Sequence, residues 1–130
     1  MSAPTAVAIT EGAYHLHLAR GRGDLDEAAR LRFEVFHLEL GEGLAGARAT
    51  GRDLDEFDEA CDHLIVRQTE TSRVVGTYRM QTREQADAHR GFYSATEFGL
   101  DWLPTEVLAG GVEVGRACID PAFRNRRVLL

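Results

Sequence analysis

The sequence predicts an α+β domain with a mainly antiparallel sheet and flanking helices. Two observations lead to this class. One long segment, residues 24–38, has apolar residues at helical spacing, whereas the other ordered segments are short and strand-like. Two of the short segments, residues 63–67 and 74–80, are separated by a short polar stretch that predicts a hairpin. Because a hairpin pairs its strands antiparallel, we expect a mainly antiparallel sheet.

The N-terminal part predicts a strand and then the clearest helix of the chain. Residues 1–12 are expected to be a disordered lead-in to a domain that spans residues 13–130. Residues 14–18 read Tyr-His-Leu-His-Leu, and this alternation predicts the first strand. Asp24, with Glu27 three residues later, resembles a capping box and is expected to start the long helix.

The rest of the chain predicts short elements joined by loops. Residues 41–60 are Gly-rich and then acidic, and they predict a loop with some helix. Residues 83–90 predict a short polar helix after the hairpin, and residues 102–111, which contain Pro104 and a Gly-Gly pair, predict a loop. Residues 112–119 predict the fourth strand, followed by a turn marked by proline, a cluster of arginines and the first residues of another helix.

Composition and charge exclude several classes of protein. The chain has 130 residues, of which 44% are hydrophobic and 28% charged, as expected of one soluble globular domain. The net charge of −6 argues against a nucleic-acid surface. No apolar run approaches the ~20 residues of a membrane span, and the N-terminus lacks the regions of a signal peptide, so a cytoplasmic protein is expected. The two cysteines follow no metal or disulfide pattern, and no metal site is predicted.

Six blocks of sequence stand out. In chain order they are LRFEVF at 31–36, DEFD at 55–58, CDHL at 61–64, VGTYR at 75–79, FYSATEF at 92–98 and EVGRACI at 113–119. Together they resemble the GNAT-type N-acyltransferases that make ornithine lipids, and the resemblance runs from about Tyr14 to the last residue. It implies that the chain is the N-terminal portion of a GNAT fold.

The resemblance also implies a reaction and its partners. A 3-hydroxyacyl chain, carried as a thioester on the phosphopantetheine of acyl carrier protein, would be transferred to the α-amino group of L-ornithine to give lyso-ornithine lipid. No permanently bound cofactor is implied, and the lipid product would allow a peripheral contact with the membrane. The transfer needs a base for the amine proton, hydrogen-bond donors for the oxyanion, and charged groups that hold a zwitterionic substrate.

The resemblance assigns the catalytic roles to Glu113 and Arg116. Glu113, on a strand between Val112 and Val114, is the candidate general base or ammonium-binding group. Arg116 would orient Glu113 or hold the carboxylate of the substrate. The alternative is an ion pair between the two residues that only stabilises the sheet.

Five further residues are candidate substrate-binding groups. Asp55 and Asp58 lie three residues apart, so one helical turn would place both on one face, where they would bind the cationic end of the substrate. The alternative for this pair is an acidic, solvated loop. Arg32 either faces the site or is a surface charge, and Arg79 is either a substrate contact or part of a buried ion pair. His63 is either a proton shuttle or a structural histidine.

Three arginines near the end of the chain, Arg124, Arg126 and Arg127, are candidate cofactor-binding residues. They stand where GNAT enzymes have a glycine-containing loop that binds the pyrophosphate of coenzyme A. Arg127 and Leu129 occupy the glycine places, so that signature is absent. A basic patch suits an acidic acyl carrier protein better than coenzyme A. The alternative is a damaged terminus without a selected function.

Two other functions remain open at this point. A smaller set of residues is also similar to the acyl-homoserine-lactone synthases, which use S-adenosylmethionine. That set is Arg32 with Phe36, Asp55 with Asp58, Arg79, and Glu113 with Arg116. The blocks at 61–64 and 93–98 favour the ornithine-lipid enzymes instead. The remaining possibility is a non-catalytic remnant, because the implied fold has further helices and strands that we expect to be absent from this chain.

One prediction concerns the strand at residues 112–119. In a regular strand, residues three apart point to opposite faces of the sheet, so Glu113 and Arg116 can serve one site only if the strand is irregular. We expect a bulge at Val114–Arg116, which Gly115 would permit. A straight ladder would exclude a shared site.

A second prediction concerns the activity of the chain by itself. Acyl transfer requires the thioester within ~3–3.5 Å of the amine, and one wall of the donor cleft cannot hold it there. We therefore expect the 130-residue chain to be poorly soluble and to show no ornithine acylation with acyl-loaded carrier protein, unless a C-terminal half is co-expressed. Turnover by the isolated chain that depends on Glu113 would contradict this expectation.

Overall fold

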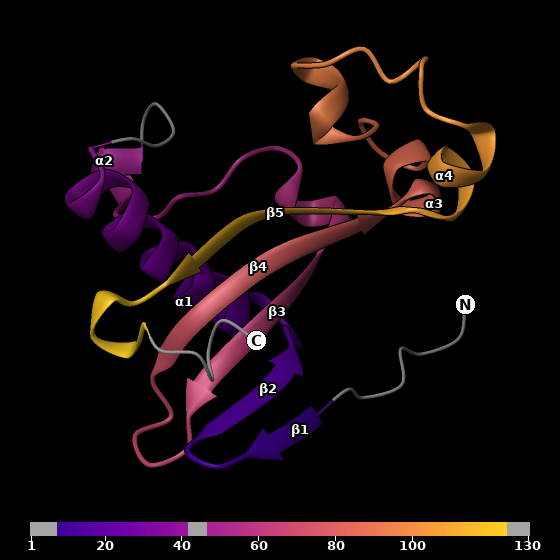
Figure 1. Ribbon diagram of the computed structural model, residues 1–130. Coiled ribbons are helices and arrows are strands. Elements are labelled where there is room, and N and C mark those ends of the chain that lie inside the picture. The colour runs from indigo at the N-terminus through magenta and orange to yellow at the C-terminus, as the bar shows by residue number, and fades with distance from the viewer. Residues whose placement is uncertain (1–7, 42–46, 125–130) are drawn as a thin grey trace.

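A five-stranded antiparallel sheet forms the centre of the fold (Figure 1). The computed structural model describes residues 8–41 and 47–124, so the helix predicted to start at 128–130 lies outside the described residues. The strands are β1 (Ala8–Glu11), β2 (Tyr14–Leu18), β3 (Asp62–Gln68), β4 (Val74–Thr82) and β5 (Val112–Ile119). Each strand pairs antiparallel with the next one along the chain. The predicted α+β class is therefore confirmed.

One long helical segment covers a face of this sheet. α1 (Arg22–Arg32) continues into the π-helical segment η1 (Phe33–Glu39), and α1 contacts β3, β4 and β5 (Figure 1). The other helices are α2 (Ala47–Thr50), α3 (Arg83–Asp87) and α4 (Thr105–Gly110), with short 3-10 turns η2 (Asp58–Ala60), η3 (Tyr93–Thr96) and η4 (Pro121–Phe123). α3 and α4 gather at the end of the sheet where β4 stops and β5 starts (Figure 1).

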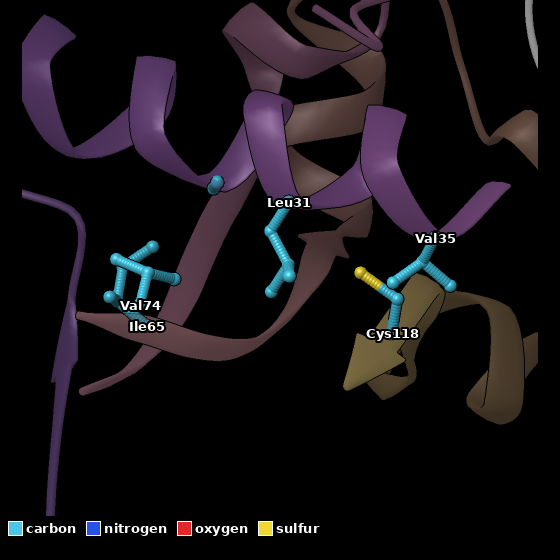
Figure 2. Packing of buried hydrophobic residues seen from close by; sticks show 6 residues of the cluster. Leu31, Val35, Ile65, Val74 and Cys118 are labelled. Atoms are coloured by element: carbon cyan, nitrogen blue, oxygen red, sulfur yellow. The ribbon is translucent and has the colours of Figure 1, made fainter. Parts of the chain in front are cut away.

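Apolar residues of α1 and η1 pack on the sheet and form the core. Figure 2 shows Leu31 and Val35 projecting toward Ile65, Val74 and Cys118 on the strands. All five side chains are buried, and burial of apolar surface is the main stabilising term of a fold. The same packing fixes the position of α1, and therefore also of its polar residues, relative to β4 and β5.

The hairpin and the elements around it agree with the sequence. β3 and β4 are joined through residues 69–73, as predicted, and β5 has the predicted bounds. α3 forms within the predicted segment 83–90. A capping box starts it: the Thr82 hydroxyl accepts from the Gln85 N–H, and the Gln85 carboxamide accepts from the Thr82 N–H.

Three predictions of local structure are wrong. β1 forms inside the predicted disordered lead-in, and because all four of its residues are exposed, no apolar alternation marks it in the sequence. α1 begins at Arg22 rather than at Asp24, whose carboxylate instead accepts the Arg20 N–H at 2.9 Å. α4 forms inside the segment 102–111 that was predicted as a loop.

The predicted irregularity of β5 is confirmed, but it involves Arg116 and Ala117 rather than the whole of Val114–Arg116. Thr77 of β4 faces Cys118, but Arg79 faces Gly115, so one residue of β4 lies opposite two residues of β5. The left-handed backbone in this bulge belongs to Arg116, with φ +51°, and not to Gly115 as expected. The bulge changes the alternation of β5, and Glu113 and Arg116 line the same pocket as a result.

We predict that Ile65→Ala lowers the free energy of unfolding by about 2–5 kcal/mol. Ile65 is fully buried between α1 and the sheet, so the truncation leaves a cavity that the helix cannot fill by moving. Urea unfolding followed by circular dichroism measures the change. Leu38→Ala is the control. Leu38 of η1 is 65% exposed, so this substitution should lower the free energy of unfolding much less. If both substitutions lowered the free energy of unfolding equally, Ile65 would not belong to the core.

Candidate functional site

A small polar pocket lies between β4, the bulge of β5 and the turn η3. Its volume is about 80 Å³. The lining residues are Cys61, Arg79, Gln81, Tyr93, Ser94, Glu113, Val114, Gly115 and Arg116. Two predicted catalytic residues, Glu113 and Arg116, therefore meet in one pocket, together with the predicted substrate-binding residue Arg79.

Glu113 is held by the start of η3. Its carboxylate accepts the N–H of Tyr93 at 2.9 Å, the N–H of Ser94 at 2.7 Å, and the hydroxyl of Ser94. The first N–H groups of a helical turn have no partner within the turn, so a carboxylate is a suitable acceptor for them. Sequence reasoning assigned no role to Tyr93 or Ser94, although both lie in the block at 92–98 that contributes to the family resemblance.

Arg116 is held by a residue that sequence reasoning missed. Its guanidinium donates to the carboxylate of Asp53 and lies over the ring of Phe36, 4.3 Å from the centroid. Asp53 is fully buried and also accepts from Arg32 Nε at 3.1 Å. Asp53 comes from the segment after α2 that was predicted as a loop, and no motif in the sequence distinguishes it from the other acidic residues there.

Asp58 continues the same buried ion-pair cluster, because Arg32 bonds both Asp53 and Asp58. Arg32 donates to both of its oxygens, at 2.8 and 3.2 Å, in a bidentate arrangement. Arg79 bridges Asp58, at 3.0 Å, and Asp55, at 2.6 Å. Arg32, Asp58 and Arg79 are each at most 4% exposed, so their charges compensate one another inside the protein.

The buried cluster shifts the ionisation of its members. Burial by itself would raise the pKa of Asp58, but hydrogen bonds and charge from Arg32 outweigh it, and the pKa is lowered overall. For Arg79, burial by itself would lower the pKa, but the hydrogen bond to Asp55 and the charge of that carboxylate outweigh burial, so the pKa is raised overall. Burial lowers the pKa of His63, whose Nε2 donates to the Asp58 carbonyl at 2.9 Å. His63 therefore supports the turn that contains Asp58.

The structure separates the predicted substrate-binding residues into two groups. Arg79 reaches the wall of the pocket. The other four, Arg32, Asp55, Asp58 and His63, are not among the lining residues and lie in the ion-pair cluster behind that wall. In this arrangement they position Arg79 and, through Asp53, Arg116.

Neither cysteine is an activated thiol. Burial raises the pKa of Cys61, on the pocket wall, to about 11 and that of Cys118, in the core, to about 12. A thiolate nucleophile at neutral pH is therefore disfavoured at both positions. Within residues 8–41 and 47–124, no group of three or more His, Cys, Asp or Glu side chains is arranged to hold a metal ion. In the same ranges no helix has the length and apolarity needed to cross a membrane.

Two apolar spaces lie along β5, and one of them adjoins the polar pocket. The first, about 240 Å³, lies between β5 and the segment from η3 to α4 and shares Ser94, Glu113 and Val114 with the pocket. Its other lining residues are mainly Leu, Val and Phe side chains. We call it the apolar chamber. The chamber and the polar pocket therefore meet at Glu113.

The second space, the apolar groove, lies between η1 and the C-terminal end of β5. Its volume is about 420 Å³, and its wall includes Phe36, the residue on which Arg116 stacks. Arg124 lies at the groove and forms a bidentate ion pair with Glu39, at 2.7 and 2.9 Å. The predicted cofactor-binding residues Arg126 and Arg127 lie outside the described residues.

We predict that Asp58→Asn lowers the free energy of unfolding by about 3–5 kcal/mol at pH 7. Arg32 and Arg79 would then be buried without the carboxylate that they share. Because the folded pKa of Asp58 lies below its ordinary value of 3.8, its stabilisation is complete above about pH 4 and is lost as the pH falls through the folded value. Urea unfolding at several pH values should show the difference from wild type shrinking in acid.

The control for this prediction is Asp62→Asn. Asp62 is the exposed first residue of β3, and surface substitutions of this kind usually change stability by about 0.5 kcal/mol or less. Equal effects of the two substitutions, or a difference that does not vary with pH, would show that Asp58 does not hold the cluster together.

Comparison with known proteins gives consistent results. The acetyltransferase (GNAT) domain family matches residues 31–130. Proteins named L-ornithine N(alpha)-acyltransferase are similar to 91% of the chain in Brucella abortus (strain 2308), at 38% identity, and in Agrobacterium fabrum (strain C58), at 36%. The protein of that name from Rhizobium meliloti (strain 1021) is 35% identical over 86% of the chain. No solved structure gives a significant match.

The chain spans 40–44% of the length of these three relatives. The family match covers most of the chain itself and includes η1, β3, β4, β5 and every residue of the polar pocket. The fold is the α+β arrangement that the resemblance led us to expect. The chain therefore belongs to the acetyltransferase (GNAT) domain family.

Proposed function

We propose that this chain is part of an N-acyltransferase that transfers a 3-hydroxyacyl chain from acyl carrier protein to the α-amino group of L-ornithine, giving lyso-ornithine lipid in the cytoplasm. The observation that supports it most is the meeting of a polar pocket and an apolar chamber at Glu113. A transferase for this reaction needs a charged place for an amino acid next to an apolar place for an acyl chain. The names of the relatives supply the acceptor, L-ornithine.

On the acceptor side, Glu113 binds the α-ammonium group and takes its proton, directly or through water. The donors from Tyr93 and Ser94 fix the carboxylate at the pocket wall. Arg116 and Arg79 provide the positive charge for the substrate carboxylate, and the ion-pair cluster behind them holds both guanidinium groups in place.

On the donor side, the apolar chamber holds the acyl chain, and the thioester lies at its boundary with the polar pocket. The phosphopantetheine arm of acyl carrier protein follows β5 toward the apolar groove and Arg124. Arg124, with Arg126 and Arg127 farther along the sequence, attracts the acidic carrier protein. The lipid product leaves from the chamber, where a peripheral membrane contact would receive it.

The reaction is a direct transfer. The amine nitrogen attacks the thioester carbonyl, a C–N bond forms and the C–S bond breaks, and the thiol of phosphopantetheine leaves with a proton. The raised pKa values of both cysteines agree with a path that has no thiolate on the protein. The bulge at Arg116 takes backbone groups out of the regular ladder, and such N–H groups are suitable donors for the tetrahedral oxyanion.

We predict that Glu113→Gln lowers ornithine acylation by about 10²–10⁴-fold, since the amide cannot accept the proton of the amine. The test uses the chain joined at its C-terminus to the remaining part of the Brucella abortus relative. Ornithine-dependent release of the carrier-protein thiol from acyl-loaded carrier protein measures the rate. The chain alone is assayed in parallel.

Glu106→Gln is the matched control, because Glu106 is exposed on α4 and contacts neither space. It should leave the rate unchanged. The proposal fails if the joined protein shows no ornithine-dependent release, or if both substitutions have the same effect.

A further inference from the structure

Gln81 is a buried polar residue without a role in the site described so far. It lies on β4 directly opposite Glu113 in the ladder with β5, and it lines the polar pocket. Its side chain is 1% exposed and is among the largest fully buried side chains of the described residues. Neither its Oε1 nor its Nε2 has a hydrogen-bond partner within the described part of the chain.

Such a residue is unfavourable for folding. A buried carboxamide without partners destabilises the folded state, whereas an apolar side chain of similar volume at the same place would not. Because Gln81 lines the pocket, a group that enters it would satisfy these hydrogen bonds. The pocket of about 80 Å³ has room for about two or three water molecules, or for a small polar head group.

A second unpartnered atom belongs to Arg116, another residue that lines the pocket. Arg116 Nε is buried and has no hydrogen-bond partner, although the terminal nitrogen of the same guanidinium is bonded to Asp53. The pocket thus offers N–H donors from Gln81 and Arg116 and an acceptor from Gln81. Glu113 adds a negative charge on the strand opposite Gln81.

These groups match the two ends of an α-amino-acid head group. We propose that Gln81 is a specificity-determining residue that recognises this head group by hydrogen bonds. This inference rests on the proposed function. Its Nε2, together with Arg116 Nε, donates to the substrate carboxylate. Its Oε1 accepts from the ammonium group that also faces Glu113. The side chain of the amino acid extends out of the pocket, which is too small for the whole of ornithine.

The first test measures binding to the joined protein and to its Gln81→Met variant, a substitution that nearly preserves volume and removes the polar atoms. Isothermal titration uses L-ornithine, glycine, 1,4-diaminobutane, which lacks the carboxylate, and 5-aminopentanoate, which lacks the α-amino group. We expect L-ornithine and glycine to bind and the two truncated analogues to bind much more weakly. In Gln81→Met we expect ornithine affinity to fall at least about tenfold.

Thermal unfolding separates this role from a structural one. If Gln81 serves a ligand, Gln81→Met leaves the Tm unchanged or raises it, because an unsatisfied amide has been removed. If Gln81 instead supports the fold, the Tm falls together with the affinity, and the proposal is overturned. The control is Gln68→Met at the end of β3, where the carboxamide accepts from the Thr71 hydroxyl at 2.8 Å, away from the pocket. It should leave ornithine binding unchanged.

The wild-type chain, labelled with ¹⁵N and combined with the unlabelled remaining part of the Brucella abortus relative, provides a readout that needs no variant. The side-chain amides of three glutamines, Gln68, Gln81 and Gln85, and of one asparagine give few ¹⁵N–¹H signals to assign. Ornithine should shift the Gln81 pair and leave the Gln68 pair in place. No shift of the Gln81 pair at saturating ornithine would mean that water alone fills the pocket, and would overturn the proposal even if Gln81→Met did not fold.

The outcomes distinguish this proposal from the proposed function. Binding that depends on Gln81, with no acyl transfer by the joined protein, refutes the transferase and leaves the head-group site in place. Acyl transfer that depends on Glu113 but proceeds with unchanged KM for ornithine in Gln81→Met refutes the role of Gln81 alone. A raised KM in that variant, with kcat nearly unchanged, supports it.

Discussion

Buried arginine–carboxylate pairs hold the two arginines of the candidate site, Arg79 and Arg116, in place. Arg32 of α1 bonds both Asp53 and Asp58, and from these two carboxylates the contacts continue to Arg116 on β5 and Arg79 on β4. One helix, one connecting segment and two strands are thereby held in a fixed arrangement. Such pairs add little net stability compared with apolar packing, because desolvation offsets most of their attraction, but loss of one member leaves a buried charge uncompensated.

The cluster supports the pocket without forming its wall. Asp58 has both oxygens occupied by Arg32 and Arg79, so it holds guanidinium groups in place rather than contacting a ligand in the pocket. Arg79 and Arg116 reach from the cluster to the pocket, and their positions are therefore fixed before any substrate arrives. Preorganised charge of this kind is what electrostatic catalysis and selective binding require. Glu113 is organised separately, by the N–H groups at the start of η3.

The bulge in β5 has a local cause and a wider effect. Arg116 adopts a left-handed backbone that is unfavourable for a residue with a side chain, and its bond to Asp53 and its contact with Phe36 hold it there. As a result, Glu113 and Arg116 share one pocket, and the apolar chamber adjoins this pocket at Glu113. The pocket, with Gln81 opposite Glu113, exists in this form because the strand is irregular.

The sequence by itself determined the class of fold and the residue types of the site. Its residue patterns predicted the long helix, the β3–β4 hairpin and the bounds of β5. The helix and the hairpin bury apolar residues, whereas Val112 and Val114 of β5 are exposed. The bulge followed from the spacing of Glu113 and Arg116 together with the shared site that the family resemblance implies for them. Only the tertiary structure revealed Asp53 and Gln81, since burial and pairing arise between segments far apart in the chain. It likewise placed the predicted acidic pair behind the pocket, because charge spacing does not specify which cation each carboxylate will meet.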